Sequence, residues 1–141
     1  MSERVFERAN HQARTDPSWQ PEIDELRRLE EAAKEMGGPD KVERQHHFGK
    51  LTVRERIDAL VDEGTFHEIG AIGGERVLQG DGTRLFQPAN FVMGRAELDG
   101  RPIVVGGDDF TVRGGASDAS IAAKQVMAEQ LANEYRVPIV R

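Results

Sequence analysis

The sequence predicts an α/β domain preceded by amino-terminal helices, and three observations support this fold class. Two apolar-rich runs, 91–98 and 101–105, are joined by Asp99-Gly100, a dipeptide that adopts the positive φ angles of a tight hairpin turn. A glycine-rich loop, a helical pattern and the apolar run 137–140 follow. Before residue 63, apolar residues recur at helical spacing. The carboxyl-terminal part therefore has the order strand, loop, helix, strand that is typical of α/β domains.

The first 21 residues are polar, and their only aromatic residues are Phe6 and Trp19. We expect residues 1–21 to form an arm that is ordered only where something holds it. A helix is predicted from Pro21 to a stop at 37–39, because five apolar residues recur at helical spacing: Ile23, Leu26, Leu29, Ala33 and Met36. The narrow apolar stripe is typical of a helix on the outside of a larger body.

A second helix is predicted over 52–62. Thr52 and Glu55 have the spacing of a capping box, and an apolar face follows: Val53, Ile57, Leu60 and Val61. The run 65–70 predicts a short strand, and the glycine-rich run 73–90 predicts a loop or an irregular hairpin. The last helix is expected to begin at Ser117 or Asp118, with an apolar face of Ile121, Met127, Ala128, Leu131 and Tyr135.

Composition limits the function. A chain of 141 residues suits one domain or a piece of a larger one, and its net charge of −6 argues against binding nucleic acid or an anionic membrane non-specifically. The chain has no cysteine, which excludes disulfides, thiolate metal sites and a cysteine nucleophile. The sequence shows neither an apolar run of membrane-spanning length nor a secretory signal, so a cytoplasmic location is expected.

The titratable residues do not suggest an acid-base or metal site. Two of the four histidines, His46 and His47, are expected to be solvated in a linker between two helices, and His11 and His67 lack ligands at metal spacing. Adjacent acids such as Asp108-Asp109 point to opposite faces of an extended chain. One of the two is expected to cap a turn or to hold the loop that follows.

The glycine loop has two interpretations. Glycines at 106, 107, 114 and 115 lie between a strand and a helix, and they match neither the GxGxxG pattern nor a P-loop. A simple turn from strand to helix would explain them. A site where a ligand approaches the backbone closely would also explain them, because glycine leaves amides unobstructed and a helix amino terminus favours negative charge.

The segments "GKLTVRERIDALVDEGTFHEIG" and "VVGGDDFTVRGGASD" together resemble the amino-terminal half of the carboxyltransferase (beta) subunit of biotin-dependent acyl-CoA carboxylases. Propionyl-CoA carboxylase beta chains are the nearest match, from about Pro21 to Arg141. The resemblance implies a partial crotonase-like (ClpP/crotonase) β-β-α spiral core. It also implies that residues 22–141 form an amino-terminal carboxyltransferase domain that is incomplete at its carboxyl end.

In that family the carboxyl group moves from carboxybiotin to the α-carbon of an acyl-CoA, and backbone amides hold the enolate. The resemblance thus implies biotin carried on a partner protein or domain, and no metal bound by this chain. It implies the following partners: acyl-CoA, a biotin carboxyl carrier, a biotin carboxylase subunit and the remainder of the carboxyltransferase, in a homo-oligomer of the full subunit. A site built from backbone amides needs glycine and no catalytic histidine.

Carried over by resemblance, Gly107 is the backbone donor of the thioester oxyanion hole, with Gly114 as the rival position. The residues that match the loop along CoA are Arg113, Gly114, Gly115, Ala116 and Ser117. Arg113 is either the partner of a phosphate or a surface cation.

The family continues past residue 140 into a Ser-Gly-Gly segment and a second half that binds biotin. We therefore expect this chain to be inactive alone. Two alternatives stay open: a noncatalytic module that assembles a carboxylase complex, and part of a biotin-linked decarboxylase carboxyltransferase.

Overall fold

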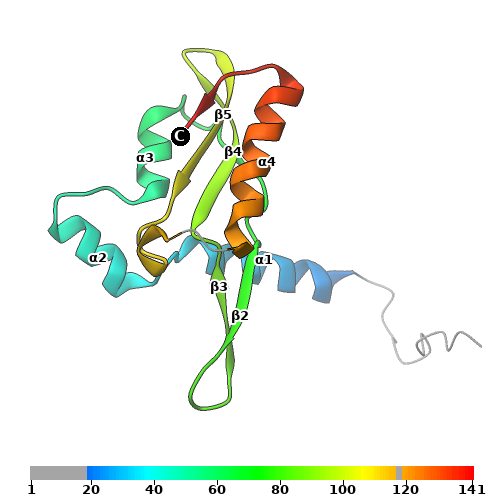
Figure 1. Cartoon of the computed structure of the whole chain (residues 1–141). Helices are drawn as coiled ribbons and strands as arrows, with labels where there is room; N and C mark the ends of the chain where they lie inside the picture. Colours follow the sequence, from blue (N-terminus) through cyan, green and yellow to red (C-terminus); the bar gives the residue numbers. More distant parts are fainter. Residues whose placement is uncertain (1–18, 117–118) are drawn as a thin grey trace, which may run out of the picture.

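The computed structural model describes residues 19–116 and 119–141 and shows an α/β fold (Figure 1). The predicted arm, except for its last residues, and the helix cap at Ser117 or Asp118 lie outside the described residues. The helices and strands in chain order are α1 (Gln20–Lys34), α2 (Pro39–His47), α3 (Val53–Leu60), β1 (His67–Glu68), β2 (Gly74–Leu78), β3 (Arg84–Pro88), β4 (Phe91–Leu98), β5 (Arg101–Asp108), the 3₁₀ turn η2 (Arg113–Gly115), α4 (Ala119–Tyr135) and β6 (Ile139–Val140).

The main sheet has the strand order β1-β4-β5-β6. Strands β1, β4 and β5 pair antiparallel, and β6 pairs parallel to β5. The predicted hairpin is confirmed, since Asp99 and Gly100 both have positive φ, 51° and 71°. β5 extends to Asp108, three residues beyond the predicted end, because β4 offers pairing partners as far as Phe91. The first glycine pair of the predicted loop therefore lies inside a strand.

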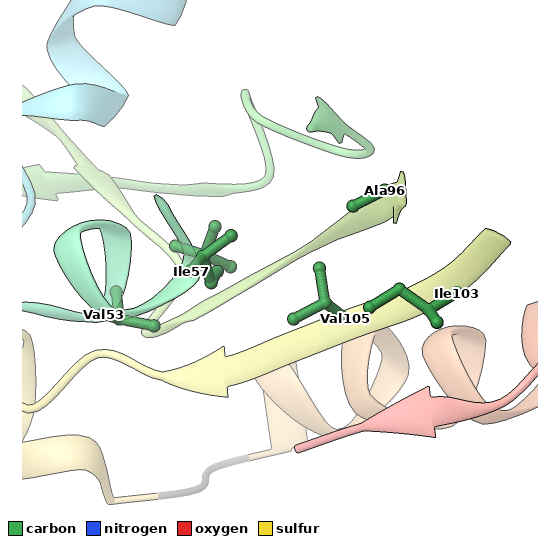
Figure 2. Packing of buried hydrophobic residues seen from close by; sticks show 6 residues of the cluster. Val53, Ile57, Ala96, Ile103 and Val105 are labelled. Carbon is green, nitrogen blue, oxygen red and sulfur yellow. The ribbon is translucent and has the colours of Figure 1, made fainter. Parts of the chain in front are cut away.

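Side chains alternate between the two faces of the sheet, and each face is covered by one helix (Figure 1). On one face, residues of α3, β4 and β5 form a core (Figure 2): Val53, Ile57, Val92, Ala96, Ile103 and Val105. On the other face, residues of β4, β5 and α4 form a second core: Phe91, Met93, Val104, Ala128 and Ala132. The glycine loop thus leaves the sheet between two packed helical layers.

The capping box of α3 is confirmed. The Thr52 amide donates to Glu55 Oε2 at 2.7 Å, and the Glu55 amide donates to Thr52 Oγ1 at 3.3 Å. The predicted short strand is also present as β1. The capping box depends on residues close in the chain, which is why its pattern was sufficient, whereas β1 depends on pairing with the distant strand β4.

The prediction of a linker around His46-His47 is wrong. Pro39 begins a further helix, α2, and both histidines lie in it, exposed to solvent. Pro39 is compatible with a helix because its fixed φ and missing N–H suit the first turn. The segment has no apolar stripe that would indicate a helix in the sequence, and none of its residues is buried.

The apolar face predicted for α4 is only partly correct. Ala128 is fully buried, whereas Met127 and Tyr135 are 47% and 55% exposed. The helix contacts the sheet through Ala128 and Ala132, whose small side chains allow a close approach. Apolar residues occur all round this helix, so their spacing alone did not define the buried face.

Residues 74–88 form a regular antiparallel hairpin, β2-β3, that projects from the main sheet (Figure 1). The sequence predicted either a loop or an irregular hairpin for this segment.

Helix α1 contacts β3, and only Ala33 of its predicted apolar stripe is buried, while Ile23 and Leu26 are exposed. α1 begins at Gln20, within the segment assigned to the arm.

Candidate functional site

Asp109 holds the start of the loop that follows β5. Its side chain is buried, and its Oδ1 accepts hydrogen bonds from the amide and the hydroxyl of Thr111, at 2.9 and 2.6 Å. Its own amide donates to the carbonyl of Asn90 at 2.8 Å. The prediction that one of the two adjacent acids holds the loop is confirmed for Asp109. The other acid, Asp108, accepts a hydrogen bond from Gln125 Nε2 at 2.9 Å.

Three consecutive residues of the loop adopt left-handed backbone angles, with φ of 49° at Arg113, 63° at Gly114 and 74° at Gly115. Glycine accepts this conformation without steric cost. Gly115 is needed for a second reason, because a Cβ there would lie 3.0 Å from Cδ1 of the Phe110 ring. The two glycines thus allow a tight turn against an aromatic ring.

One backbone amide of this turn is not a donor in the hydrogen bonds of the turn. The amides of Val112, Gly115 and Ala116 donate to carbonyls three residues earlier, at 3.0 to 3.2 Å. Among the backbone hydrogen bonds of the described residues, the Gly114 amide is not a donor. The Ala116 carbonyl is held by Asn90 Nδ2 at 2.7 Å. Gly114 therefore offers an N–H on a loop that is fixed on both sides.

Gly107 lies in β5, opposite Val92 of β4. The amide of Val104 donates to the Pro138 carbonyl on the β6 side, at 2.9 Å. Because amides alternate in direction along a strand, the Gly107 amide, three residues later, is directed toward β4. A Cβ at Gly107 would lie 2.8 Å from Val53 Cγ2, so this glycine allows α3 to approach the sheet.

The guanidinium of Arg113 forms an ion pair with the carboxylate of Glu75 in β2. This contact joins the loop to the base of the projecting hairpin. Of the five residues matched to the CoA loop, Arg113, Gly114, Gly115 and Ala116 thus lie together in one ordered turn, and Ser117 lies outside the described residues.

A pocket of about 490 Å³ lies between α2 and the loop. Gly114, Phe110 and Arg113 line it from the loop side. Three cationic side chains line it from α2 and the turn after it: Lys41, Arg44 and Lys50. The sequence analysis missed this cluster because it missed α2. The signal that could have found it is the spacing of Lys41 and Arg44, one helical turn apart.

Within residues 19–116 and 119–141, no group of three or more histidine or carboxylate residues is placed to hold a metal ion. None of the helices in this described part has the length and apolarity needed to cross a membrane.

Residues 44–141 match the family described as the carboxyl transferase domain. The chain is 37% identical over 127 residues to the propionyl-CoA carboxylase carboxyltransferase subunit of Haloferax mediterranei. It is 35% identical over 119 residues to the methylmalonyl-CoA decarboxylase subunit alpha of Propionigenium modestum. Each alignment covers 84% of this chain and 23% of the relative, so the chain spans about a quarter of the length of these proteins.

The solved structure of transcarboxylase 12S, with methylmalonyl-coenzyme A and methylmalonic acid bound, matches with a TM-score of 0.75 and 30% identity, over 88% of this chain and 24% of that one. The geranyl-CoA carboxylase beta subunit of P. aeruginosa has the same fold, with a TM-score of 0.66 and 21% identity, over 84% of this chain and 22% of that one. These neighbours are crotonase-fold carboxyltransferases, so the predicted partial crotonase-like α/β core is confirmed. The chain belongs to the carboxyl transferase domain family, as its resemblance to carboxyltransferase subunits of acyl-CoA carboxylases implied.

Proposed function

We propose that this segment forms the acyl-CoA side of a carboxyltransferase, which moves a carboxyl group between carboxybiotin and the α-carbon of an acyl-CoA. The observation that carries the proposal is the loop after β5. In a chain of the carboxyl transferase family, its left-handed residues hold the Gly114 amide outside the hydrogen bonds of the turn. Two relatives are named for propionyl-CoA and methylmalonyl-CoA, which supports an acyl-CoA thioester as the ligand.

The proposed task of the loop is to stabilise negative charge on the thioester oxygen. A pre-aimed backbone donor of this kind contributes on the order of 3 kcal/mol to transition-state stabilisation. We assign the donor to Gly114 in preference to Gly107, because the Gly107 amide is directed into the β4 ladder. The acid-base residues that many enzymes use are not required by this arrangement.

The rest of the loop is proposed to run along the CoA molecule, as expected for Gly115, Ala116 and Ser117. Two roles were considered for Arg113, a surface cation and a partner for a phosphate. The ion pair with Glu75 favours the first, a surface cation that fastens the loop. Loop position then depends on β2 as well as on β5.

The groups that line the pocket beside the loop do not fit biotin. Four cations, Arg113 among them, and the backbone amide of Gly114 suit anionic phosphates, whereas the ureido ring of biotin is uncharged. We therefore assign no biotin-binding residue to the described chain. The proposed partners are a biotin carboxyl carrier, a biotin carboxylase subunit and further carboxyltransferase residues that hold the biotin, in a homo-oligomer. Transcarboxylase 12S, a similar structure, assembles as a hexamer.

The proposal covers carboxyl transfer in either direction, because the chain is similar to a carboxylase subunit and to a decarboxylase subunit at nearly equal identity. The test is an assay of the complete, assembled protein. Carboxylation of propionyl-CoA and biotin-dependent decarboxylation of methylmalonyl-CoA are measured separately. A folded complex that catalyses neither would overturn the proposal and support a noncatalytic assembly module.

The role of Gly114 has its own test. Gly114→Pro removes the amide N–H and also cannot adopt the φ of 63° found at this position, whereas Gly114→Ala keeps the N–H at a strain of about 1–2 kcal/mol. We expect the proline variant to lose at least a hundredfold in kcat and the alanine variant to keep most of it. Unfolding curves of both variants show whether the fold is intact. Equal loss of kcat in the two variants would contradict a donor role for Gly114.

A further inference from the structure

Asn90 lies in the short link between β3 and β4, and its side chain is fully buried. Burying a side-chain amide costs free energy unless the amide is hydrogen-bonded. Neither the sequence motifs nor the proposed chemistry gives this residue a task. The hydrogen bonds of Asn90 therefore have to explain why a buried amide stands at this position.

Asn90 contacts both ends of the loop that runs from Asp109 to Ala116. Its backbone carbonyl accepts the amide of Asp109 at 2.8 Å, and its side-chain Nδ2 donates to the carbonyl of Ala116 at 2.7 Å. One residue thus closes the loop, with its backbone at the first residue and its side chain at the last. Fixing both ends of a loop reduces the number of conformations that the middle can adopt.

The contact with Ala116 determines the direction of the Gly114 amide. The Ala116 amide donates to the carbonyl of Arg113 at 3.2 Å. That carbonyl and the Gly114 N–H belong to the same peptide group, which is planar and trans, so the two point in opposite directions. Holding Ala116 in place therefore holds the Gly114 N–H in one orientation.

Another contact near this end of the loop is weaker. The ion pair of Arg113 with Glu75 joins side chains that are 39% and 46% exposed, and such exposed pairs contribute little. The donor from Asn90 is buried, and surroundings of low polarity strengthen a hydrogen bond. The orientation of Ala116 thus depends more on Asn90 than on the ion pair.

The oxygen of the Asn90 amide indicates a role beyond stability. Within residues 19–116 and 119–141, Oδ1 of Asn90 is buried and has no hydrogen-bond partner. A buried acceptor without a partner destabilises a fold, and an apolar side chain at this position would avoid that cost. What Asn90 adds to the protein is therefore its donor, the Nδ2 that holds Ala116.

We propose that Asn90 is a positioning residue for carboxyl transfer. It acts through Ala116 and Arg113, and it keeps the Gly114 N–H directed at the thioester oxygen while negative charge develops there. A donor that is already oriented stabilises such charge well, because it need not turn during the reaction. The inference rests on the proposed function, which gives the Gly114 amide its task.

Two variants remove the side-chain donor and keep the backbone carbonyl that holds Asp109. Asn90→Asp keeps the shape but has no N–H, and Asn90→Ala removes the polar group without adding a charge. Asn133→Asp, at an exposed position of α4, is the matched control. Each substitution is made in the complete, assembled protein, and urea unfolding defines the conditions under which each variant is folded.

The first measurement is hydrogen exchange of the segment 109–116 by mass spectrometry, which needs no catalytic activity. We expect exchange of this segment to be about fivefold faster in both Asn90 variants and unchanged in the control. The second measurement is the steady-state kinetics of carboxyl transfer. We expect kcat to fall about tenfold and the KM for acyl-CoA to change less than about threefold, because the oriented amide acts on the transition state.

Unchanged exchange of the loop in the folded variants would overturn the inference, as would an unchanged kcat in a variant whose loop exchanges faster. Faster exchange along the whole chain would assign Asn90 to the general stability of the fold and would also reject the inference. If the wild type transfers no carboxyl group, the proposed function fails. The exchange measurement then still supports or rejects Asn90 as the residue that fixes the loop.

Discussion

The amide of Gly37 donates a hydrogen bond to the hydroxyl oxygen of Thr111 at 2.9 Å, although 74 positions separate the two residues in the chain. The same hydroxyl donates to the buried carboxylate of Asp109 at 2.6 Å. The turn between α1 and α2 is therefore fastened to the loop after β5. This contact sets the distance between the two sides of the pocket that lies between α2 and the loop, because α2 begins just after Gly37.

Thr111→Val should destabilise the protein by about 1–3 kcal/mol, because it leaves the Gly37 amide and part of the Asp109 carboxylate without a partner in a buried place. Urea unfolding measures the change. The hairpin offers a matched control, since Thr83 makes the same two contacts with Asp81, at 2.9 and 2.6 Å, in an exposed turn. Thr83→Val should cost less than about 0.5 kcal/mol, and an equal cost in both variants would show that the link to Gly37 contributes nothing.

Gly37→Ala should also destabilise the fold, by about 1–3 kcal/mol, because a Cβ at this position would overlap the carbonyl oxygen of Thr111. The overlap is with backbone, which cannot move aside as a flexible side chain can. Gly80→Ala is the control, since no atom lies within 4 Å of the added Cβ. The thermal midpoint is expected to fall for Gly37→Ala alone, and a matching fall for Gly80→Ala would refute the steric explanation.

Glu55 links the pH dependence of stability to the contact between α2 and α3. The hydrogen bond from the Thr52 amide, followed by that from His46, lowers the pKa of Glu55 from 4.5 to about 2. Because the folded pKa is depressed, this stabilisation is present above about pH 4.5 and is lost as the pH falls through about 2. Glu55→Gln should therefore lower stability at pH 7 and flatten the pH profile between these values.

Chemical unfolding at several pH values tests this prediction. Glu43→Gln, which changes an exposed carboxylate of α2, serves as the control and should keep the wild-type profile. A Glu55→Gln variant with an unaltered profile would show that the capping box and the His46 contact do not affect stability through ionisation.

Asp62 holds the turn between β4 and β5 from outside the hairpin. Its carboxylate accepts the amides of Asp99 and Gly100, at 3.0 and 2.7 Å. Asp62→Ala should cost about 1 kcal/mol, since both amides lose an acceptor in a place that water can reach. Asp62→Asn keeps one acceptor and should cost less. Hydrogen exchange at the two turn amides reports the effect directly, and unchanged protection in the alanine variant would contradict it.

The helix α2 and the strand β5 show where sequence patterns were insufficient. α2 carries no apolar stripe, so nothing in its spacing separated it from a linker. The extension of β5 to Asp108 depends on the partners that β4 provides, and it turned Gly107 from a loop residue into a paired strand residue. The ion pair of Arg113 with Glu75 joins residues of two separate elements, and no local pattern indicates it.

The sequence by itself determined the features that depend on neighbouring residues. The hairpin follows from the φ angles that Asp99-Gly100 accepts, the start of α3 from the capping box of Thr52 and Glu55, and the tight turn from Gly114-Gly115. Only the tertiary structure decided which loop amide donates no backbone hydrogen bond and which cationic side chains line the pocket beside α2. Those outcomes depend on strand pairing and on the contact between Gly37 and Thr111, and such contacts form only when distant segments pack together.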